Sequence, residues 1–156
     1  MGNKISINKE AIVVFESRNN NISGFILFTQ LFDKVKIDIS VSGLKDGLHG
    51  IHIHKAGDLR DDCVSACDHY NPYNKEHGGL DSGHSGDLGN INVINNICSD
   101  SFYCDKFIVD EIIGRSLIIH ENEDDLGLTN HKDSKTTGNS GKRLCCAIIG
   151  ISKNSC

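Results

Sequence analysis

Lys34-Val35-Lys36-Ile37-Asp38-Ile39-Ser40-Val41 alternates polar and apolar residues along its whole length. Successive side chains of a β-strand point to opposite faces, so this alternation predicts a strand with one face buried. Further strand-like runs cover 11–15, 22–29, 48–54, 89–94, 102–109, 115–120 and 144–151. No helical periodicity of useful length and no internal repeat accompanies them. We therefore expect an all-β chain of eight short strands in an antiparallel sandwich or barrel.

Two long polar loops interrupt the strand pattern. The density of apolar residues falls from 55 to 88 and again from 121 to 143. A connection of such length without structure of its own is normally disordered or functional. The first of these loops, 55–88, carries His69, His77, His84 and Asp87, and a bound ion can order a loop, so we call it the metal loop. Its residues therefore favour the functional interpretation.

Composition favours one soluble domain covering 1–156. The 156 residues are 38% apolar and 24% charged, with a net charge of −5 and no basic stripe, so nucleic acid is not an expected partner. No stretch approaches a transmembrane span and the N-terminus lacks the apolar core of a secretory signal, which predicts a cytoplasmic protein. Seven cysteines are too few for a disulfide scaffold. Most should be reduced thiols, and the sequence allows a single structural disulfide.

The N-terminal residues Met1-Gly2-Asn3-Lys4-Ile5-Ser6 fit the loose pattern for myristoylation at Gly2. The pattern is short and degenerate. A single acyl chain gives only marginal binding to a membrane, so we expect no stable membrane association in either case.

Histidines give the strongest indication of chemistry. His52 and His54 are two apart in a predicted strand and therefore project the same way, ready to bind one ion. His69, His77, His84 and Asp87 follow in the metal loop, and His120 ends a second apolar run. Imidazoles suit copper and zinc, and three histidines with one carboxylate suit a closed tetrahedral zinc site. The series predicts a metal centre.

The motifs as a whole resemble the copper/zinc superoxide dismutase family over nearly the whole chain. They are 50–54 (GIHIH), 69–72 (HYNP), 77–79 (HGG), 86–90 (GDLGN), 112–121 (IIGRSLIIHE), 124–127 (DDLG), 137–144 (TGNSGKRL) and Cys146. The likeness is weakest before Leu31 and over 91–111, which is short for the family and leaves that hairpin undefined. The resemblance implies an eight-stranded antiparallel Greek-key β-barrel, an Ig-like sandwich. It also implies dismutation of superoxide to dioxygen and hydrogen peroxide by a copper ion cycling between Cu(II) and Cu(I).

Two ligand sets follow from this resemblance. Copper is expected on His52, His54, His69 and His120, and a structural zinc on His69, His77, His84 and Asp87, with one of each metal per subunit. His69 would bridge the two ions and move a proton during turnover. Asp124 would fix both halves by bonding His52 and His77.

The resemblance also assigns substrate and structural roles. Arg143 would bind the superoxide anion, and Thr137 would narrow the channel with it. The loop 121–143, which we call the steering loop, also carries Lys132, Lys135 and Lys142, which could attract anions despite the negative net charge. Cys63 and Cys146 would form the family's disulfide, and Cys145 should then face away from Cys63.

Partners are implied in the same way. The family pairs two barrels through positions that here are Gly57, Ile113, Gly114, Ile148 and Ile151, so we expect a homodimer. Ala56, where many members have a larger apolar residue, predicts a looser dimer. A copper chaperone is a further possible partner.

Other functions fit these residues less well. A non-catalytic copper carrier or buffer, or a chaperone-like relative, should lack a copper histidine or the arginine, and both are present. A purely structural zinc module would leave His52, His54 and His120 without a purpose. The glycine-rich stretch 138–142 lacks the spacing of a phosphate-binding loop. An oxidoreductase is the hypothesis that uses all of these residues.

Overall fold

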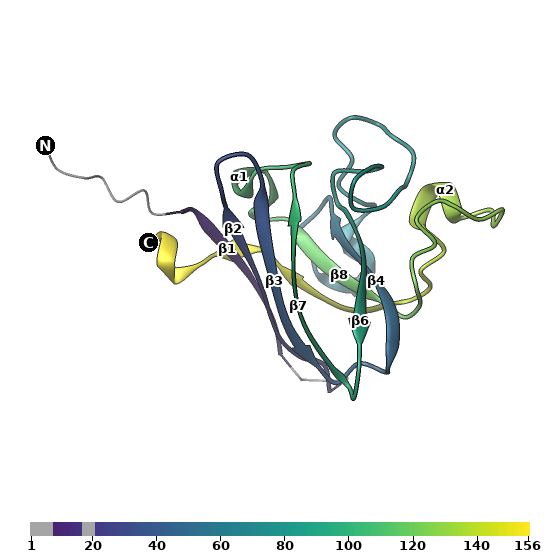
Figure 1. Cartoon of the computed structure of the whole chain (residues 1–156), viewed down its shortest axis with the longest axis horizontal. Helices are drawn as coiled ribbons and strands as arrows, with labels where there is room; N and C mark the ends of the chain where they lie inside the picture. The colour runs from purple at the N-terminus through teal and green to yellow at the C-terminus, as the bar shows by residue number, and fades with distance from the viewer. Residues whose placement is uncertain (1–7, 17–20) are drawn as a thin grey trace, which may run out of the picture.

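The computed structural model describes residues 8–16 and 21–156, and nearly all of its regular structure is β (Figure 1). Gly2 lies outside the described residues. The strands are β1 Glu10–Phe15, β2 Ser23–Gln30, β3 Val35–Ser42, β4 Gly47–His54, β5 Arg60–Cys63, β6 Asp87–Val93, β7 Ile97–Cys104, β8 Ser116–His120, β9 Arg143–Ile148 and β10 Gly150–Ile151. The helical turns are α1 Val109–Ile112, α2 Ser134–Thr137, and the 3₁₀ turns η1 Val64–Ala66 and η2 Lys153–Ser155.

The strands form two antiparallel sheets with the core between them. One sheet has the order β10-β1-β2-β3-β7 and the other β6-β4-β8-β9. Because β3 pairs with β7, and β4 with both β6 and β8, neighbours in space are distant in sequence, as in a Greek key. Core residues come from both sheets, among them Val13, Ile26, Ile37, Ile51 and Leu117. The prediction of an all-β antiparallel barrel is confirmed.

The alternation in β3 gives the burial that it predicts. Val35, Ile37, Ile39 and Val41 are buried, whereas the residues between them face outward. Ile37 pairs with Phe28 of β2 on one side and with Phe102 of β7 on the other. A strand with two partners and one apolar face has a single register that buries the whole set.

Strands β4 and β8 behave differently, because both of their faces are covered. Ile51 and Ile53 point into the core with no exposed surface, and His52 and His54 on the other face are also buried, under the two long loops. All of β8 is buried, and its last residue is His120. The two strands therefore hold three histidines, His52, His54 and His120, on surfaces that the loops cover.

The predicted strand 102–109 is wrong at its C-terminal end. β7 ends at Cys104, and Val109 begins the short helix α1. Phe107 and Val109 turn into the core instead of continuing the alternation, and Glu111 Oε2 accepts the backbone N–H of Ile108 to begin the helix. Burial of two apolar side chains at the end of the barrel outweighs their preference for a strand.

The hairpin within 91–111, which the sequence left undefined, has an ordinary tight turn. Asn95 and Asn96 connect β6 to β7, with φ of 53° and 61°, and Ile94 pairs with Ile97 across the turn. Two positive φ values at the central residues are those of a type I′ turn, in which Asn is favoured. The final run 144–151 also divides, because Gly150 and Ile151 leave β9 to pair with β1 in the other sheet.

A disulfide joins the metal loop to β9. Cys63 and Cys146, 83 residues apart, are bonded as expected, and the other five cysteines are free. Closing so long a loop removes much of the unfolded chain's freedom, and losing such a bridge typically costs about 2–5 kcal/mol. Cys145 is on the opposite face and buried, which raises the pKa of its thiol to about 12. Its burial keeps it away from exchange with the bridge.

Among the described residues, no helix is long and apolar enough to cross a membrane.

Candidate metal centre

Three parts of the fold deliver the histidines to one place. β4 supplies His52 and His54, the end of β8 supplies His120, and the metal loop supplies His69. The loop is held against β4 by backbone bonds, since Tyr70 N–H donates to the carbonyl of Ile53 at 2.8 Å and His69 forms a β-bridge with His54. The rings of His52 and His69 consequently stack with centroids 4.0 Å apart.

The first cluster consists of four buried histidines. One nitrogen from each of four rings lies within 4.8 Å of all the others, in His52, His54, His69 and His120. Among the described residues, Nδ1 of His52, Nε2 of His54 and Nε2 of His120 are buried without a hydrogen-bond partner. Buried nitrogens are rarely left unpaired. Three in one cluster are what an ion with imidazole ligands requires.

The opposite nitrogen of each of these rings is held by the protein. Nε2 of His52 donates to Asp124 at 2.6 Å, Nδ1 of His54 to the Cys67 carbonyl at 2.8 Å, and Nδ1 of His120 faces the Gly141 carbonyl at 3.4 Å. Such partners fix the ring and leave the free nitrogen aimed at an ion. The arrangement fits a bound metal.

Burial also sets the charge of these rings. It lowers the pKa of His52 far below the ordinary value, that of His54 to about 2 and that of His120 to about 4, with His69 adding to each shift. A histidine with a lowered pKa is neutral at physiological pH, which is the form that binds metals.

The second cluster adds His77 and Asp87 to His69 and His52, again with ligand atoms within 4.8 Å. Asp87 Oδ1 is 2.8 Å from Nδ1 of His69, and its Oδ2 is 3.0 Å from Nδ1 of His77. The contact between His77 and Asp87 is close enough for an ion pair, but its geometry is not that of a hydrogen bond. The buried Nδ1 of His77 therefore has no hydrogen-bond partner among the described residues. Nδ1 of His77 is therefore a further buried ring nitrogen that is available to an ion.

His84 belongs beside this second cluster, although it is not among those four. Its Nδ1 is 3.2 Å from Asp87 Oδ1 and 3.2 Å from Nδ1 of His69. Burial alone would raise the pKa of Asp87, but the hydrogen bond from His69 and the close contacts with the rings of His77 and His84 hold it well below its usual range. Asp87 is therefore an anion surrounded by three imidazoles.

Asp124 connects the two clusters. Its Oδ2 accepts from His52 and its Oδ1 from His77, at 2.6 and 2.8 Å. Burial would lower the pKa of His77, but the two carboxylates, Asp124 and Asp87, raise it to about 9. The side chain of Asn90 fixes Asp124 in turn through two bonds to its backbone, at 2.7 and 2.9 Å. A metal at the second cluster must displace the proton from Nδ1 of His77.

Gly138 leaves the space that this bridge needs, and replacing it tests the bridge. It has a φ of +71°, and a Cβ there would lie 2.6 Å from Cγ of Asp124 and closer still to Nε2 of His77. We expect Gly138→Ala to push Asp124 away and to lower metal affinity about 10- to 100-fold, measured by competition with a chelator. Gly89→Ala is the control, because Gly89 has a φ of +78° and no atom within 4 Å of the added carbon. Equal losses in both variants would contradict the account.

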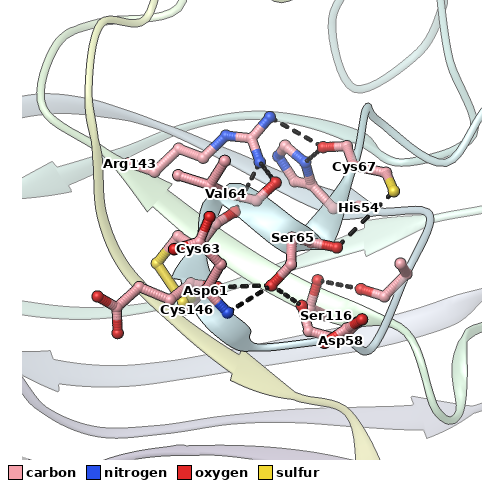
Figure 2. Close-up of a disulfide and its surroundings, with 12 residues drawn as sticks. His54, Asp58, Asp61, Cys63, Val64, Ser65, Cys67, Ser116, Arg143 and Cys146 are labelled. Carbon is pink, nitrogen blue, oxygen red and sulfur yellow. Dashed lines mark hydrogen bonds between the residues drawn. A yellow bond between two sulfur atoms is a disulfide. The ribbon is translucent and has the colours of Figure 1, made fainter.

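Arg143 and Thr137 line a cleft of about 1040 Å³ that also reaches His54, His69, His84 and His120. Figure 2 shows how Arg143 is held: Nη1 donates to the Cys63 carbonyl at 2.7 Å and Nη2 to the Cys67 carbonyl at 2.8 Å. Lys135 of the steering loop lines the cleft, as do Lys55 and Lys75. Lys132 does not line it, and Lys142 lines a separate pocket beside the disulfide.

Cys67 holds two residues of the site through one carbonyl oxygen, which accepts from both His54 and Arg143 (Figure 2). Its φ of 65° and ψ of −155° lie in a region that is almost restricted to glycine. We expect Cys67→Gly to raise the free energy of unfolding by about 1 kcal/mol, because it removes this strain. Chemical denaturation measures the change. Cys67→Ala, which removes the thiol but keeps Cβ, should give no such gain; a gain from alanine equal to that from glycine would contradict the explanation.

Three residues near the site were not predicted. Asn90 is the last residue of the 86–90 motif, and this place was the signal that could have identified it. His49 is buried, with its ring nitrogens 2.7 Å from the His120 carbonyl and 2.8 Å from the Lys45 carbonyl. It is the other histidine of β4, and its place in the predicted strand 48–54 was the available indication. Lys106, which follows β7, is not marked by any pattern in the sequence.

Comparisons with known proteins agree with this geometry. The family model for copper/zinc superoxide dismutase (SODC) matches residues 22–149. The chain is 45% identical to an extracellular Cu-Zn superoxide dismutase of Drosophila melanogaster, over 87% of the chain and 80% of the relative. It is 44% identical to a Cu-Zn superoxide dismutase of Paramecium bursaria Chlorella virus 1, over 93% of the chain and 80% of that protein.

Two further matches show how widely the fold is used. The copper chaperone for superoxide dismutase of Rattus norvegicus is 42% identical over 97% of this chain, which spans 57% of the chaperone. The crystal structure of the clock protein EA4 superposes with a TM-score of 0.89 at 36% identity, covering 97% of this chain and all of the other.

Proposed function

The chain belongs to the copper/zinc superoxide dismutase family, and we propose how its own residues share the work of that enzyme. The reaction converts two superoxide anions and two protons to dioxygen and hydrogen peroxide. The observation that carries the proposal is the group of unpartnered ring nitrogens of His52, His54 and His120 beside the guanidinium of Arg143. A metal centre and an anion-binding group thus share one cleft, and we propose that the whole chain works as one domain around it.

Family membership implies copper and zinc, and we propose which side chains hold each. His52, His54, His69 and His120 would bind copper, and His69, His77, His84 and Asp87 would bind zinc. When bound, copper supplies one-electron transfer between Cu(II) and Cu(I), and zinc supplies a fixed charge without redox chemistry. His84 is preferred to His52 for zinc because Nε2 of His52 is already bonded to Asp124. One nitrogen of His52 remains, and the first cluster uses it.

His69 is proposed to carry a proton between the two half-reactions. Its Nδ1 faces Asp87 at 2.8 Å, so Nε2 is the nitrogen left to face the first cluster. Burial lowers the pKa of His69, which keeps the ring neutral and able to release a proton that it has taken up. Nε2 would hold the proton and then pass it to the reduced substrate. Thr137 would restrict the channel to small anions.

Arg143 is proposed to bind superoxide. Two carbonyl oxygens fix one edge of its guanidinium, so its charge is held at a set place in the cleft. Lys135, Lys55 and Lys75 in the cleft wall would raise the local positive potential despite the net charge of −5. Lys132 and Lys142 would contribute only to the longer-range field.

Anomalous scattering from crystals, recorded at the copper and zinc absorption edges, tests these assignments. We expect a copper peak among the nitrogens of His52, His54, His69 and His120, and a zinc peak within bonding distance of His84 and Asp87. A zinc peak bonded to His52 and distant from His84 would contradict the second set.

We also propose that the enzyme is a homodimer formed through Gly57, Ile113, Gly114, Ile148 and Ile151. Ile148 and Ile151 are 48% and 60% exposed, whereas Ile149 between them is fully buried. Exposed apolar side chains in a self-complementary patch give a closed two-fold pair. Ala56 offers little apolar area beside this patch, so the dimer would be looser than the family norm.

Sedimentation at micromolar concentration is expected to show one dimeric species. Ile151→Asp should shift it to monomer, because a charge would be buried in the contact. Ile97→Asp, at a residue with similar exposure (56%) on the far hairpin, should leave the dimer intact. A wild-type protein that sediments as a monomer with both metals bound would contradict the assembly, without affecting the chemistry.

The cytoplasm is the proposed location. Five cysteines are free thiols, and Cys67 and Cys156 are exposed, which suits a reducing compartment. A copper chaperone is a proposed partner for metal loading, since such a protein shares the fold. Cell fractionation with thiol labelling tests the location; five blocked thiols in protein from the native cell would contradict it.

A further inference from the structure

Backbone carbonyl oxygens surround the charged group of Lys106. It follows β7, and its Nζ donates to the carbonyls of Gly79 and Ser82, both at 2.9 Å, His84 at 2.8 Å and Asp87 at 2.6 Å. The side chain is half-buried. An ammonium group has three donors, so four carbonyl oxygens at these distances form a cage around a cation rather than a set of separate hydrogen bonds.

The caged segment has no regular structure of its own, and its C-terminal end is held by Gly86, whose N–H donates to Tyr70 and whose carbonyl accepts from Ile53, both at 2.8 Å. Between Gly79 and Asp87 there is no helix or strand, and the backbone bonds within it are two turn contacts, Ser82 N–H to Gly79 at 3.3 Å and Asp87 N–H to His84 at 3.1 Å. The same segment carries His84 and Asp87. Ordering a loop against its conformational entropy needs contacts from outside it. Lys106 brings four of these contacts from the end of β7, on the other sheet.

We propose that Lys106 is a positioning residue, a tethered cation that folds residues 79–87 into their zinc-binding form before the metal arrives and slows zinc release. This inference rests on the proposed zinc ligands His69, His77, His84 and Asp87. A carbonyl cage selects for a cation that can donate hydrogen bonds, so a neutral side chain of similar length would not replace it.

The sign of the effect separates positioning from direct electrostatics. A positive charge beside Asp87 repels a divalent ion, so removing it would by Coulomb's law alone tighten zinc binding. If the main role of Lys106 is to hold the loop, removing it weakens zinc binding instead. The two explanations predict opposite changes.

The test measures zinc release to an excess of chelator from the intact holoenzyme. Lys106→Met, which keeps an aliphatic stem, is expected to release zinc about 10- to 100-fold faster than wild type, the usual effect of losing a group that supports a ligand. Lys36→Met is the charge-matched control, because Lys36 lies on the outer face of β3, where it forms a partly exposed ion pair with Asp38. Co(II) in the zinc site should show an altered visible spectrum in Lys106→Met alone.

Rescue provides the readout that packing alone would not move. In Lys106→Ala, ammonium ions are expected to re-enter the cage and slow zinc release toward the wild-type rate. Tetramethylammonium at the same ionic strength cannot donate hydrogen bonds and should not. Equal effects of the two ions, or release from Lys106→Met no faster than from Lys36→Met, would overturn the inference. A wild-type enzyme that binds no zinc would instead overturn the zinc assignment itself.

Discussion

Replacing His120 with alanine is expected to abolish superoxide dismutation and to leave a folded protein that still contains zinc. His120 supplies one nitrogen to the first cluster and none to the second, and its Nε2 is buried without a partner. Its removal takes away one of the four proposed copper ligands while Asp87, His77 and Asp124 keep their contacts. The rate of superoxide removal, zinc content by mass spectrometry and the circular dichroism spectrum measure the three parts of the result.

His131→Ala is the matched control for this variant. His131 is in the steering loop, its side chain is 43% exposed, and its Nδ1 lies 3.8 Å from the carboxylate of Asp133. Activity should be unchanged. Full activity of His120→Ala with zinc as the sole metal would end the copper mechanism.

Replacing Arg143 with glutamate is expected to slow turnover by about 10- to 1000-fold, the range over which charge steers an ion to its site. Metal content should not change, because Arg143 donates to backbone carbonyl oxygens, and His54 keeps its own bond to the carbonyl of Cys67 when the guanidinium is removed. The salt dependence should also reverse. Added salt slows wild type by screening an attraction, and speeds the variant by screening a repulsion.

Two variants separate this role from a structural one. Arg143→Lys keeps the charge and should recover part of the rate. Arg60→Glu makes the same charge change at an exposed residue that pairs with Asp58, away from the cleft, and should have little effect. Unchanged rates for Arg143→Glu at both low and high ionic strength would contradict the assignment.

The sequence was sufficient for the strands whose burial is one-sided. β3 lies where its alternation predicts, and the strand histidines of β4 face the same way because the period of a strand is two. The strand predictions failed where side chains that pack into the core turn the chain out of the strand direction. Val109 was predicted in a strand, but it closes the end of the barrel from a helix.

The candidate site divides in the same way. His69, Asp87 and Asp124 could be named from the sequence, because each lies in a motif that resembles the family and the motifs occur in the same order along the chain. Lys106 could not, because its four partners lie 19 to 27 residues earlier and are backbone atoms, which carry no side-chain pattern. Lys142 was named from its position in the loop, but the direction of β9 sends it to a different pocket.

Metal content and superoxide removal, measured on the same preparation, test the central claim most directly. The account predicts one copper and one zinc per subunit, with a rate that rises in proportion to copper as the protein is loaded. A fully copper-loaded protein that does not remove superoxide would contradict it, and would favour a copper carrier of the same fold.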